Sequence, residues 1–350
     1  MQTNLVTVHL LCCRFMIFFS DHQQEGDNMK EFGFYTCDVF TDRCFSGNQL
    51  AVIPDAERFT AKEMQRIAAE FNFSETTFVM PSKDPNCSHR VRIFTPKHEL
   101  PFAGHPVLGT AFILAGRGTL KSENDTIKTV FELEIGPVPV EIQFAEGEPA
   151  YMRLTIPEPA VPEKPNITIS DIASSLNLNE SEIGFDSFKP SNGFFGTKML
   201  LVPLKNSEVL EKARINIERW NEVLSINEIR AVYLFTKNSV GELRKIPDSL
   251  TENIGERKPD FSARMFAPEL GVPEDPATGA AAAFLASYLS VNDPEIIKRK
   301  NCTVSRIIEQ GVQMQRPSRL EIQIHKTDES KSIQVGGSAV LVSCGSMFTG

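Results

Sequence analysis

Two segments of the chain run a turn containing proline and glycine directly into an apolar stretch. The first segment is 99–114 and the second is 274–285. Small and apolar residues occupy every side of both stretches, which predicts helices buried all round rather than amphipathic surface helices. The first N–H groups of a helix lack partners within it and carry partial positive charge, so they form a ready site for a carboxylate or a phosphate. We therefore expect the two helix starts to face each other and to form the active site.

The rest of the hydrophobic pattern predicts strands and one amphipathic helix. Residues 60–71 carry apolar side chains at helical spacing, and Thr60 with Glu63 forms a capping-box pattern at the start of this helix. Alternating and β-branched stretches predict the strands, and Gly136-Pro137 predicts the turn of a hairpin. The predicted strand segments are 32–40, 50–53, 76–80, 91–94, the hairpin 130–144, and 334–342.

Short motifs of the first half of the chain recur in the second half in the same order. The interval from glycine to proline in the first motif is seven residues in both halves (54 − 47 and 203 − 196), and the second motif stands just before an apolar helix both times. An internal repeat of this kind predicts an α+β fold of two pseudo-symmetric domains, each a mixed β-sheet wrapped around a central apolar α-helix. The matched motifs are Phe45-x-Gly47 to Pro54 with Phe194-x-Gly196 to Pro203, and Arg92-x-Phe94-x-Pro96 with Arg264-x-Phe266-x-Pro268.

A proline-rich stretch at 157–165 is the expected domain boundary. The first domain is then 29–157 and the second 158–337, and we expect a strand at about 338–346 to return to the first domain. Residues 1–28 form an N-terminal extension that we expect to be disordered. The alternative is a signal peptide, since 8–19 is apolar, but Arg14 interrupts this stretch, no basic residue precedes it and no small-residue cleavage site follows.

Charge and composition argue against nucleic acids and membranes as partners of this chain. The chain has 350 residues and a net charge of -9, and no cluster of lysine and arginine resembles a nucleic-acid or membrane-binding surface. No glycine-rich nucleotide fingerprint follows a strand. The seven cysteines show no zinc-binding spacing and no disulfide framework, so we expect free thiols, a cytoplasmic location and no metal. We expect a small carboxylated molecule as the partner, and the sequence leaves open whether the chain forms a homodimer.

Three polar side chains next to the apolar helices are candidates for acid–base chemistry. Glu75 stands where a helix gives way to a strand among apolar residues, which disfavours its charged form and raises its pKa. The alternative is that Glu75 caps a turn or pairs with an arginine. His105 lies at the start of the first helix, and Asp275 lies before Pro276 at the start of the second. For both residues the alternative to acid–base chemistry is a purely structural role in capping the helix. Together the three residues suggest an acid–base site around a bound anion.

Four strings of residues give the chain a resemblance to a known family. It resembles the PhzF-type, phenazine-biosynthesis-like isomerase/epimerase family, within the diaminopimelate-epimerase-like fold, from about Met29 to about Ser343. The resemblance implies an active site in a cleft between two domains and no cofactor. The strings are Ser46-Gly47-Asn48-Gln49-Leu50-Ala51-Val52, Phe73-Ser74-Glu75-Thr76-Thr77-Phe78, Phe102-Ala103-Gly104-His105-Pro106 and Glu274-Asp275-Pro276-Ala277-Thr278-Gly279.

The resemblance also implies roles for individual residues. Glu75 is the acid/base that moves the proton, and His105 and Asp275 are supporting polar groups. The substrate-binding residues are Asn48, Gly104, Ala277, Thr278 and Gly279, of which Gly104 and 277–279 hold the substrate carboxylate through their backbone. Many relatives carry serine after the last glycine of the fourth string, where this chain has Ala280.

A comparison within the wider fold favours one mechanism. Racemases and epimerases of this fold place a cysteine at each of the two central helices, whereas neither 103–105 nor 275–279 contains one. We therefore expect a cofactor-independent isomerase that shifts a proton within a small carboxylated substrate by means of a single glutamate. The alternatives are a two-base amino-acid racemase or epimerase, and a binding or scaffold protein that keeps the fold without catalysis.

Overall fold

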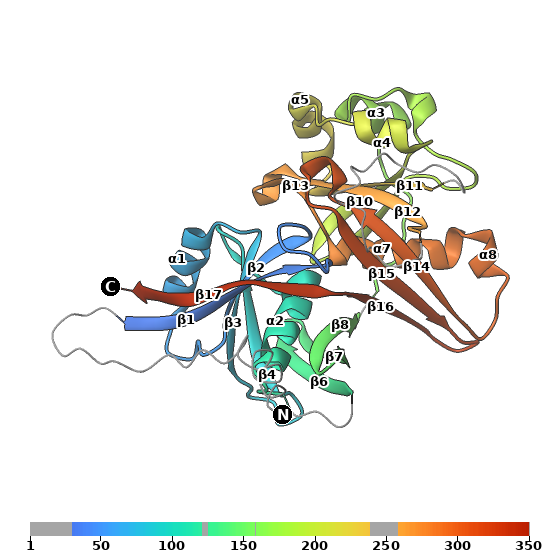
Figure 1. Cartoon of the computed structure of the whole chain (residues 1–350). Coiled ribbons are helices and arrows are strands. Elements are labelled where there is room, and N and C mark those ends of the chain that lie inside the picture. Colours follow the sequence, from blue (N-terminus) through green and yellow to red (C-terminus); the bar gives the residue numbers. More distant parts are fainter. Residues whose placement is uncertain (1–29, 121–124, 158, 239–257, 350) are drawn as a thin grey trace, which may run out of the picture.

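Two apolar helices lie inside curved layers of strands (Figure 1). The computed structural model describes residues 30–120, 125–157, 159–238 and 258–349, so the N-terminal extension expected at 1–28 lies outside the described residues. The fold is a mixed α/β fold in which strand pairing links all seventeen strands of the described chain into one mixed sheet.

The strands of the first half curve around helix α2 (Gly104–Gly116). Helix α1 (Ala61–Phe71) packs on the outer side of this layer, where Met64 contacts the apolar cluster that includes Ile53, Phe78 and Phe94. The strands are β1 (Lys30–Val39), β2 (Asn48–Ile53), β3 (Glu75–Pro81), β4 (His89–Phe94), β5 (Glu99–Leu100), β6 (Thr126–Leu133), β7 (Gly136–Ala145) and β8 (Glu148–Thr155).

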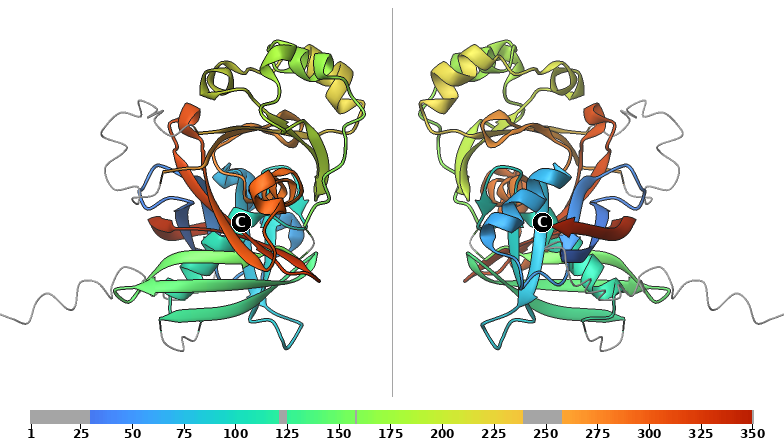
Figure 2. Two further views of the ribbon diagram at one scale, coloured as in Figure 1. Left: turned by 90° about the vertical axis from the view of Figure 1, so that its right-hand side faces the viewer. Right: turned by 90° about the vertical axis from the view of Figure 1, so that its left-hand side faces the viewer.

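The strands of the second half form a similar layer around helix α7 (Gly279–Asn292). Helices α3 (Ile169–Ser175), α4 (Ser207–Lys212), α5 (Ile217–Arg219) and the π-helical turn η2 (Trp220–Ser225) cover its outer side (Figure 2). Helix α8 (Pro294–Ile297) follows α7. The strands are β9 (Ser191–Phe195), β10 (Thr197–Pro203), β11 (Ala231–Lys237), β12 (Phe261–Ala267), β13 (Val272–Asp275), β14 (Cys302–Gln310), β15 (Ser318–Lys326) and β16 (Lys331–Gly337).

The two layers repeat the same order of strand pairing. In the first half, β1–β2 is antiparallel, β2–β3 parallel, β3–β4 antiparallel, β4–β6 parallel, and β6–β7–β8 antiparallel. In the second half, β9–β10 is antiparallel, β10–β11 parallel, β11–β12 antiparallel, β12–β14 parallel, and β14–β15–β16 antiparallel. The short strands β5 and β13 occupy matching positions, and each precedes the apolar helix of its own half.

Strand pairing joins the two halves at two places. Strand β8 pairs with β16, so the two layers are continuous there. The strand predicted at 334–342 is interrupted at Ser338, so its residues belong to two strands. The first of these is β16, and the second, β17 (Ala339–Thr349), pairs antiparallel with β1 along its length. The division into domains at 157 stays a prediction.

Both apolar helices are buried nearly all round, as the sequence predicts. Twelve of the thirteen residues of α2 and eleven of the fourteen of α7 are buried. Strands β1 and β2 pack so closely against α2 that only a small residue fits at their contact with the helix. An ideal Cβ added to Gly109 would lie 2.5 Å from Leu50 Cδ2 and 2.8 Å from Val39 Cγ2, which is closer than real atoms approach.

Other local predictions are confirmed as well. Helix α1 starts at a capping box, in which the Thr60 hydroxyl accepts from the Glu63 N–H and the Glu63 carboxylate accepts from the Thr60 N–H. Strands β6 and β7 form the expected hairpin, but its turn is at 134–135, and Gly136 and Pro137 are the first two residues of β7.

The repeated arginine motif builds the same arrangement in both halves. Arg92 forms two hydrogen bonds with Glu99 (2.6 Å each), and Arg264 forms two with Glu274 (2.8 and 2.9 Å). Each guanidinium also lies over the phenylalanine two positions later, at 5.0 Å from the Phe94 ring and 4.7 Å from the Phe266 ring. Each ion pair therefore fixes the turn that leads into one of the two apolar helices.

Candidate active site

The starts of α2 and α7 meet backbone to backbone. An ideal Cβ on Gly104 would lie 3.1 Å from Gly279 Cα, and one on Gly279 would lie 3.2 Å from Gly104 Cα. Neither helix start has a side-chain cap. The N–H groups at these starts keep their partial positive charge for an anionic ligand, so two helix dipoles favour negative charge at one place.

Glu75 is the first residue of β3, directly after the loop that follows α1. Its side chain is 14% exposed, and its Oε2 atom is buried without a hydrogen-bond partner. Burial, and then the negative charge of Asp275, raises the pKa of Glu75 well above its ordinary value of 4.5. The alternative pairing with an arginine is not found in the described part of the chain, so the carboxyl is available to give and take a proton.

His105 is the second residue of α2, and its side chain is 5% exposed. Its Nε2 atom lies 3.3 Å from Glu75 Oε2, but the two groups are not oriented as a hydrogen bond, and both atoms stay without a partner. Burial lowers the pKa of His105 to about 3, so its imidazole is neutral at pH 7. His105 therefore contacts Glu75 as a neutral polar group rather than as a counter-ion.

Asp275 does not have the position that the sequence suggests. It ends β13, and α7 begins only at Gly279 after Thr278, so the interpretation of Asp275 as an N-cap with Pro276 in the first helical position is wrong. Its carboxylate accepts hydrogen bonds from Asn48 Nδ2 (2.9 Å) and from the Thr278 hydroxyl. Burial raises its pKa to about 6, although these two hydrogen bonds oppose the shift.

Asn48 joins the two halves at the site. This residue begins β2 and is buried, with 1% of its surface exposed. Its amide nitrogen lies within hydrogen-bonding distance of His105 Nδ1 (3.3 Å), Asp275 Oδ1 (2.9 Å) and the Ala277 carbonyl oxygen (2.9 Å). Its amide oxygen is buried and has no partner. Asn48 therefore holds together groups from both helix starts.

The remaining predicted binding residues lie at the starts of α2 and α7. The Ala277 carbonyl oxygen accepts a hydrogen bond from Asn48, and the Thr278 hydroxyl donates one to Asp275. These two groups therefore hold the site together and are not free to bind a ligand. Gly104 and Gly279 provide the backbone contact between the two helices. Ala280 follows Gly279 and is partly exposed, and its methyl group supplies no hydrogen bond.

Two residues of the site carry no recognisable signal in the sequence. Gln310 ends β14 and binds the turn between Asp275 and Thr278 through its amide. Arg316 lies between η4 (Val312–Met314) and β15 and donates to Asp38, Ser46 and Gly47, which fixes the loop leading to Asn48. A lone glutamine or arginine at a strand end fits no motif, so only the fold brings these two residues to the site.

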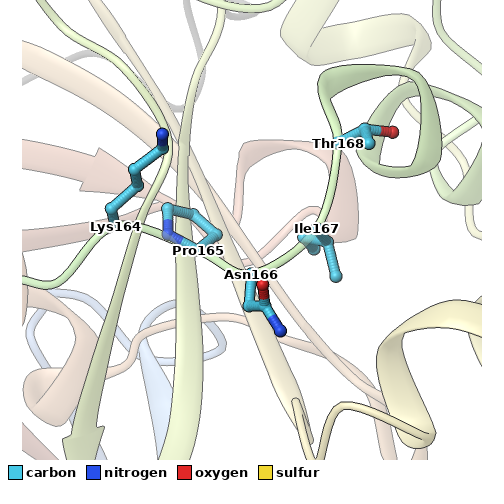
Figure 3. A pocket seen from close by; sticks show the side chains of 5 residues that line it. All are labelled: Lys164, Pro165, Asn166, Ile167 and Thr168. Carbon is cyan, nitrogen blue, oxygen red and sulfur yellow. The ribbon is translucent and has the colours of Figure 1, made fainter.

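Other features of the described chain do not resemble binding sites. None of the described helices is long and apolar enough to cross a membrane, and the described histidine, cysteine, aspartate and glutamate side chains form no group of three that could hold a metal. A shallow surface hollow is lined only by the consecutive residues 164–168 (Figure 3). In that view the Lys164 and Thr168 side chains lie at opposite ends of the segment and do not converge.

Comparison with known proteins shows the family of this chain. The model of the phenazine biosynthesis-like protein family (PhzC-PhzF) matches residues 37–345. The chain therefore belongs to this family.

Individual relatives cover nearly all of the chain. An uncharacterized isomerase of Mesorhizobium japonicum is 32% identical over 89% of this chain and 97% of its own length. The trans-2,3-dihydro-3-hydroxyanthranilate isomerase of Pseudomonas aeruginosa is 29% identical over 86% of this chain and 94% of its own length. Relatives named as isomerases thus support an isomerase activity at the level of the family.

Solved structures place the fold in the same group. A PhzF-family phenazine biosynthesis protein of Bacillus anthracis superposes with a TM-score of 0.77 at 25% identity, over 91% of this chain and 99% of that chain. A hydroxyproline epimerase of Agrobacterium vitis superposes with a TM-score of 0.59 at 10% identity, over 91% and 92%. The second likeness concerns the fold alone, and it agrees with the expected relation to epimerase folds.

Proposed function

We propose that the chain is a cofactor-independent isomerase that moves a proton between two carbons of a small carboxylated substrate, with Glu75 as its single acid/base. One observation carries the proposal. Glu75 has a buried oxygen without a partner and a raised pKa, and it belongs to the same polar cluster as the meeting starts of α2 and α7. A carboxyl group whose protonated form is favoured by burial thus accompanies a site suited to a carboxylate ligand.

The proposed reaction conserves atoms and charge within the site. Glu75 as carboxylate takes a proton from one carbon of the substrate, and the electron pair of the broken C–H bond delocalises towards the bound carboxylate. The helix starts stabilise this negative charge. Glu75 as carboxylic acid then returns the proton to another carbon, which restores its starting state. The opposite order, with donation first, closes the same cycle, and the raised pKa of Glu75 favours the protonated form from which that order starts.

The proposal extends to the arrangement of the chain and to the substrate. We propose that the two matching halves act as two domains and that the substrate binds in the cleft between them. The name of the Pseudomonas aeruginosa relative specifies a cyclic, unsaturated carboxylate for that protein. We propose a substrate of this class for the present chain, held by the backbone at Gly104, Ala277 and Gly279, since the Thr278 N–H already donates to Gln310.

The test measures proton transfer directly. The purified protein is incubated in D₂O with trans-2,3-dihydro-3-hydroxyanthranilate and with a panel of cyclic unsaturated carboxylates and free amino acids, and deuterium incorporation is followed by NMR. We expect the wild type to incorporate deuterium into a cyclic carboxylate. In Glu75→Gln the rate of incorporation should fall at least 100-fold, because a general acid/base typically contributes ~10²–10⁴-fold to a rate. Glu70→Gln, which changes an exposed glutamate on α1, is the matched control and should retain activity.

The alternatives predict different results. A two-base racemase would exchange the α-proton of an amino acid, whereas a scaffold protein would incorporate no deuterium into any member of the panel. Equal rates for Glu75→Gln and the wild type would refute the assignment of Glu75.

A further inference from the structure

Gln310 uses its whole hydrogen-bonding capacity at the candidate site. It is completely buried at the end of β14. Its amide oxygen accepts from the Tyr233 hydroxyl (3.2 Å) and from the Thr278 N–H (3.3 Å). Its amide nitrogen donates to the Asp275 carbonyl oxygen (2.8 Å) and to Thr278 Oγ1 (3.1 Å). An amide has two acceptor and two donor positions, so these four contacts fix its orientation.

The orientation of Gln310 decides the orientation of the Thr278 hydroxyl. Because an amide nitrogen can only donate, Thr278 Oγ1 is the acceptor in its contact with Gln310. The single hydrogen of the hydroxyl then points to Asp275 Oδ2, with which it forms a hydrogen bond. The other carboxylate oxygen of Asp275 accepts from Asn48. Both oxygens of Asp275 therefore face donors.

Asp275 depends on these donors because no described cationic side chain forms an ion pair with it. The titratable groups around it are Glu75 on β3, His105 on α2 and Tyr233 on β11. His105 is neutral at pH 7, and burial together with the charge of Asp275 raises the pKa of Tyr233, so neither supplies a positive charge. The nearest arginine in the chain sequence, Arg264, is paired with Glu274.

We propose that Gln310 is a positioning residue of this site, which fixes the Thr278 hydroxyl as a donor, keeps Asp275 a hydrogen-bond acceptor and leaves the transferable proton on Glu75. The inference rests on the proposed function, because it concerns the same acid/base. Its physical consequence reaches Glu75 through Asp275, since the charge of Asp275 is one of the two causes that raise the pKa of Glu75.

The test needs no substrate. The protein is labelled with ¹³Cγ-aspartate, the Asp275 signal is assigned with Asp275→Asn, and its titration is followed by NMR in the ligand-free protein. Without Gln310 the Thr278 hydroxyl can turn and accept a hydrogen bond from protonated Asp275, which stabilises the neutral acid. We expect Gln310→Met to raise the pKa of Asp275 above its wild-type value by roughly one unit, a tenfold change in the dissociation constant.

A double-mutant cycle separates positioning from a general structural role. Thr278→Val removes the hydroxyl that Gln310 orients, so adding Gln310→Met to it should cause no further shift. Gln334→Met removes a glutamine amide on β16 that is bonded to Thr155 and His325, and it should leave the titration of Asp275 unchanged. Thr278→Ser keeps the hydroxyl and should titrate like the wild type.

Two results would overturn the proposal. One is an unchanged titration of Asp275 in a folded Gln310→Met protein, and the other is an additive shift in the double variant. If Gln310→Met does not fold, Gln310→Asn replaces it in the test. Its amide is shorter by one methylene group and cannot reach Thr278, so it must raise the pKa of Asp275 in the same way. Failure of the proposed function gives a different result. The wild type then incorporates no deuterium into any substrate, while the shifts in the pKa of Asp275 are still observed.

Discussion

Gly104 and Gly279 touch through their backbones, because a Cβ on Gly104 would lie only 3.1 Å from Gly279 Cα and 3.4 Å from its carbonyl carbon. These two residues are far apart in the sequence, and each is the first residue of its helix. The contact sets the distance between two positively polarised helix starts. Any side chain at either position separates them.

Gly104→Ala should therefore damage ligand binding more than it damages the fold. The added methyl group pushes the two helix starts apart by a few tenths of an ångström, and we expect kcat/KM to fall roughly tenfold or more, since small displacements of positioning groups are costly. The matched control is Gly116→Ala at the other end of the same helix, where alanine has the higher helix propensity. Steady-state kinetics and thermal unfolding of both variants check the expectation, and a loss confined to stability would contradict it.

Removing the Glu75 carboxyl should stabilise the protein at high pH. The pKa of Glu75 is raised in the folded state, so folding favours its protonated form. The stability contributed by this preference is complete below the unfolded-state pKa near 4.5 and is lost as the pH rises through the folded-state value. Glu75→Gln cannot ionise, so we expect its Tm to exceed that of the wild type at pH 8 and to approach it at pH 4. Calorimetry at both pH values, with Glu70→Gln as the control, measures the difference, and a Tm gap that does not depend on pH would count against the raised pKa.

Asn48 provides a sharper test of the hydrogen bonds between the halves. Asn48→Ala removes the donor to Asp275 and Ala277 and leaves buried acceptors without partners, which should cost about 1–3 kcal/mol of the free energy of unfolding. The pKa of Asp275 should rise above about 6, because the hydrogen bond from Asn48 lowers it. Asn48→Asp keeps the shape but places an acceptor against Asp275, so its effects should be larger. Urea unfolding and NMR titration measure both, and a smaller effect of aspartate than of alanine would argue against donation by Asn48.

The two equivalent arginines should differ in their importance for stability. The Arg264 side chain is 4% exposed and also donates to backbone carbonyls, including those of Leu210 and Ala213, whereas the Arg92 side chain is 19% exposed. Arg264→Met leaves Glu274, whose side chain is 20% exposed, without its counter-ion and leaves the carbonyls of Leu210 and Ala213 without this donor, so we expect a loss of about 3 kcal/mol. Arg92→Met should cost about 1 kcal/mol. Denaturant unfolding of both variants provides the comparison, and equal losses would show that burial of the pair is not the deciding factor.

Local patterns in the sequence determined much of this structure. The apolar composition of 104–116 and 279–292 suffices to predict buried helices, since no polar face is available for solvent. Thr60 with Glu63 predicts the start of α1, and the repeated arginine motif predicts matching arrangements in the two halves. The sequence also singles out Glu75 and His105 as candidates, because a carboxylate among apolar residues and a histidine at a helix start are local features, and the structure places the two side chains 3.3 Å apart.

Only the tertiary structure decided how these parts meet. The sequence cannot show that Asn48 bonds to Asp275 or that Gln310 orients Thr278, because these contacts join residues from separate elements through side chains with no pattern of their own. The exact start of α7 is also not predicted, because Pro276 suits a first helical position, whereas α7 begins only at Gly279 and the Thr278 N–H donates to Gln310. Hydrophobic periodicity is a local signal, whereas the partners of a buried polar group are chosen by the packing of the whole chain.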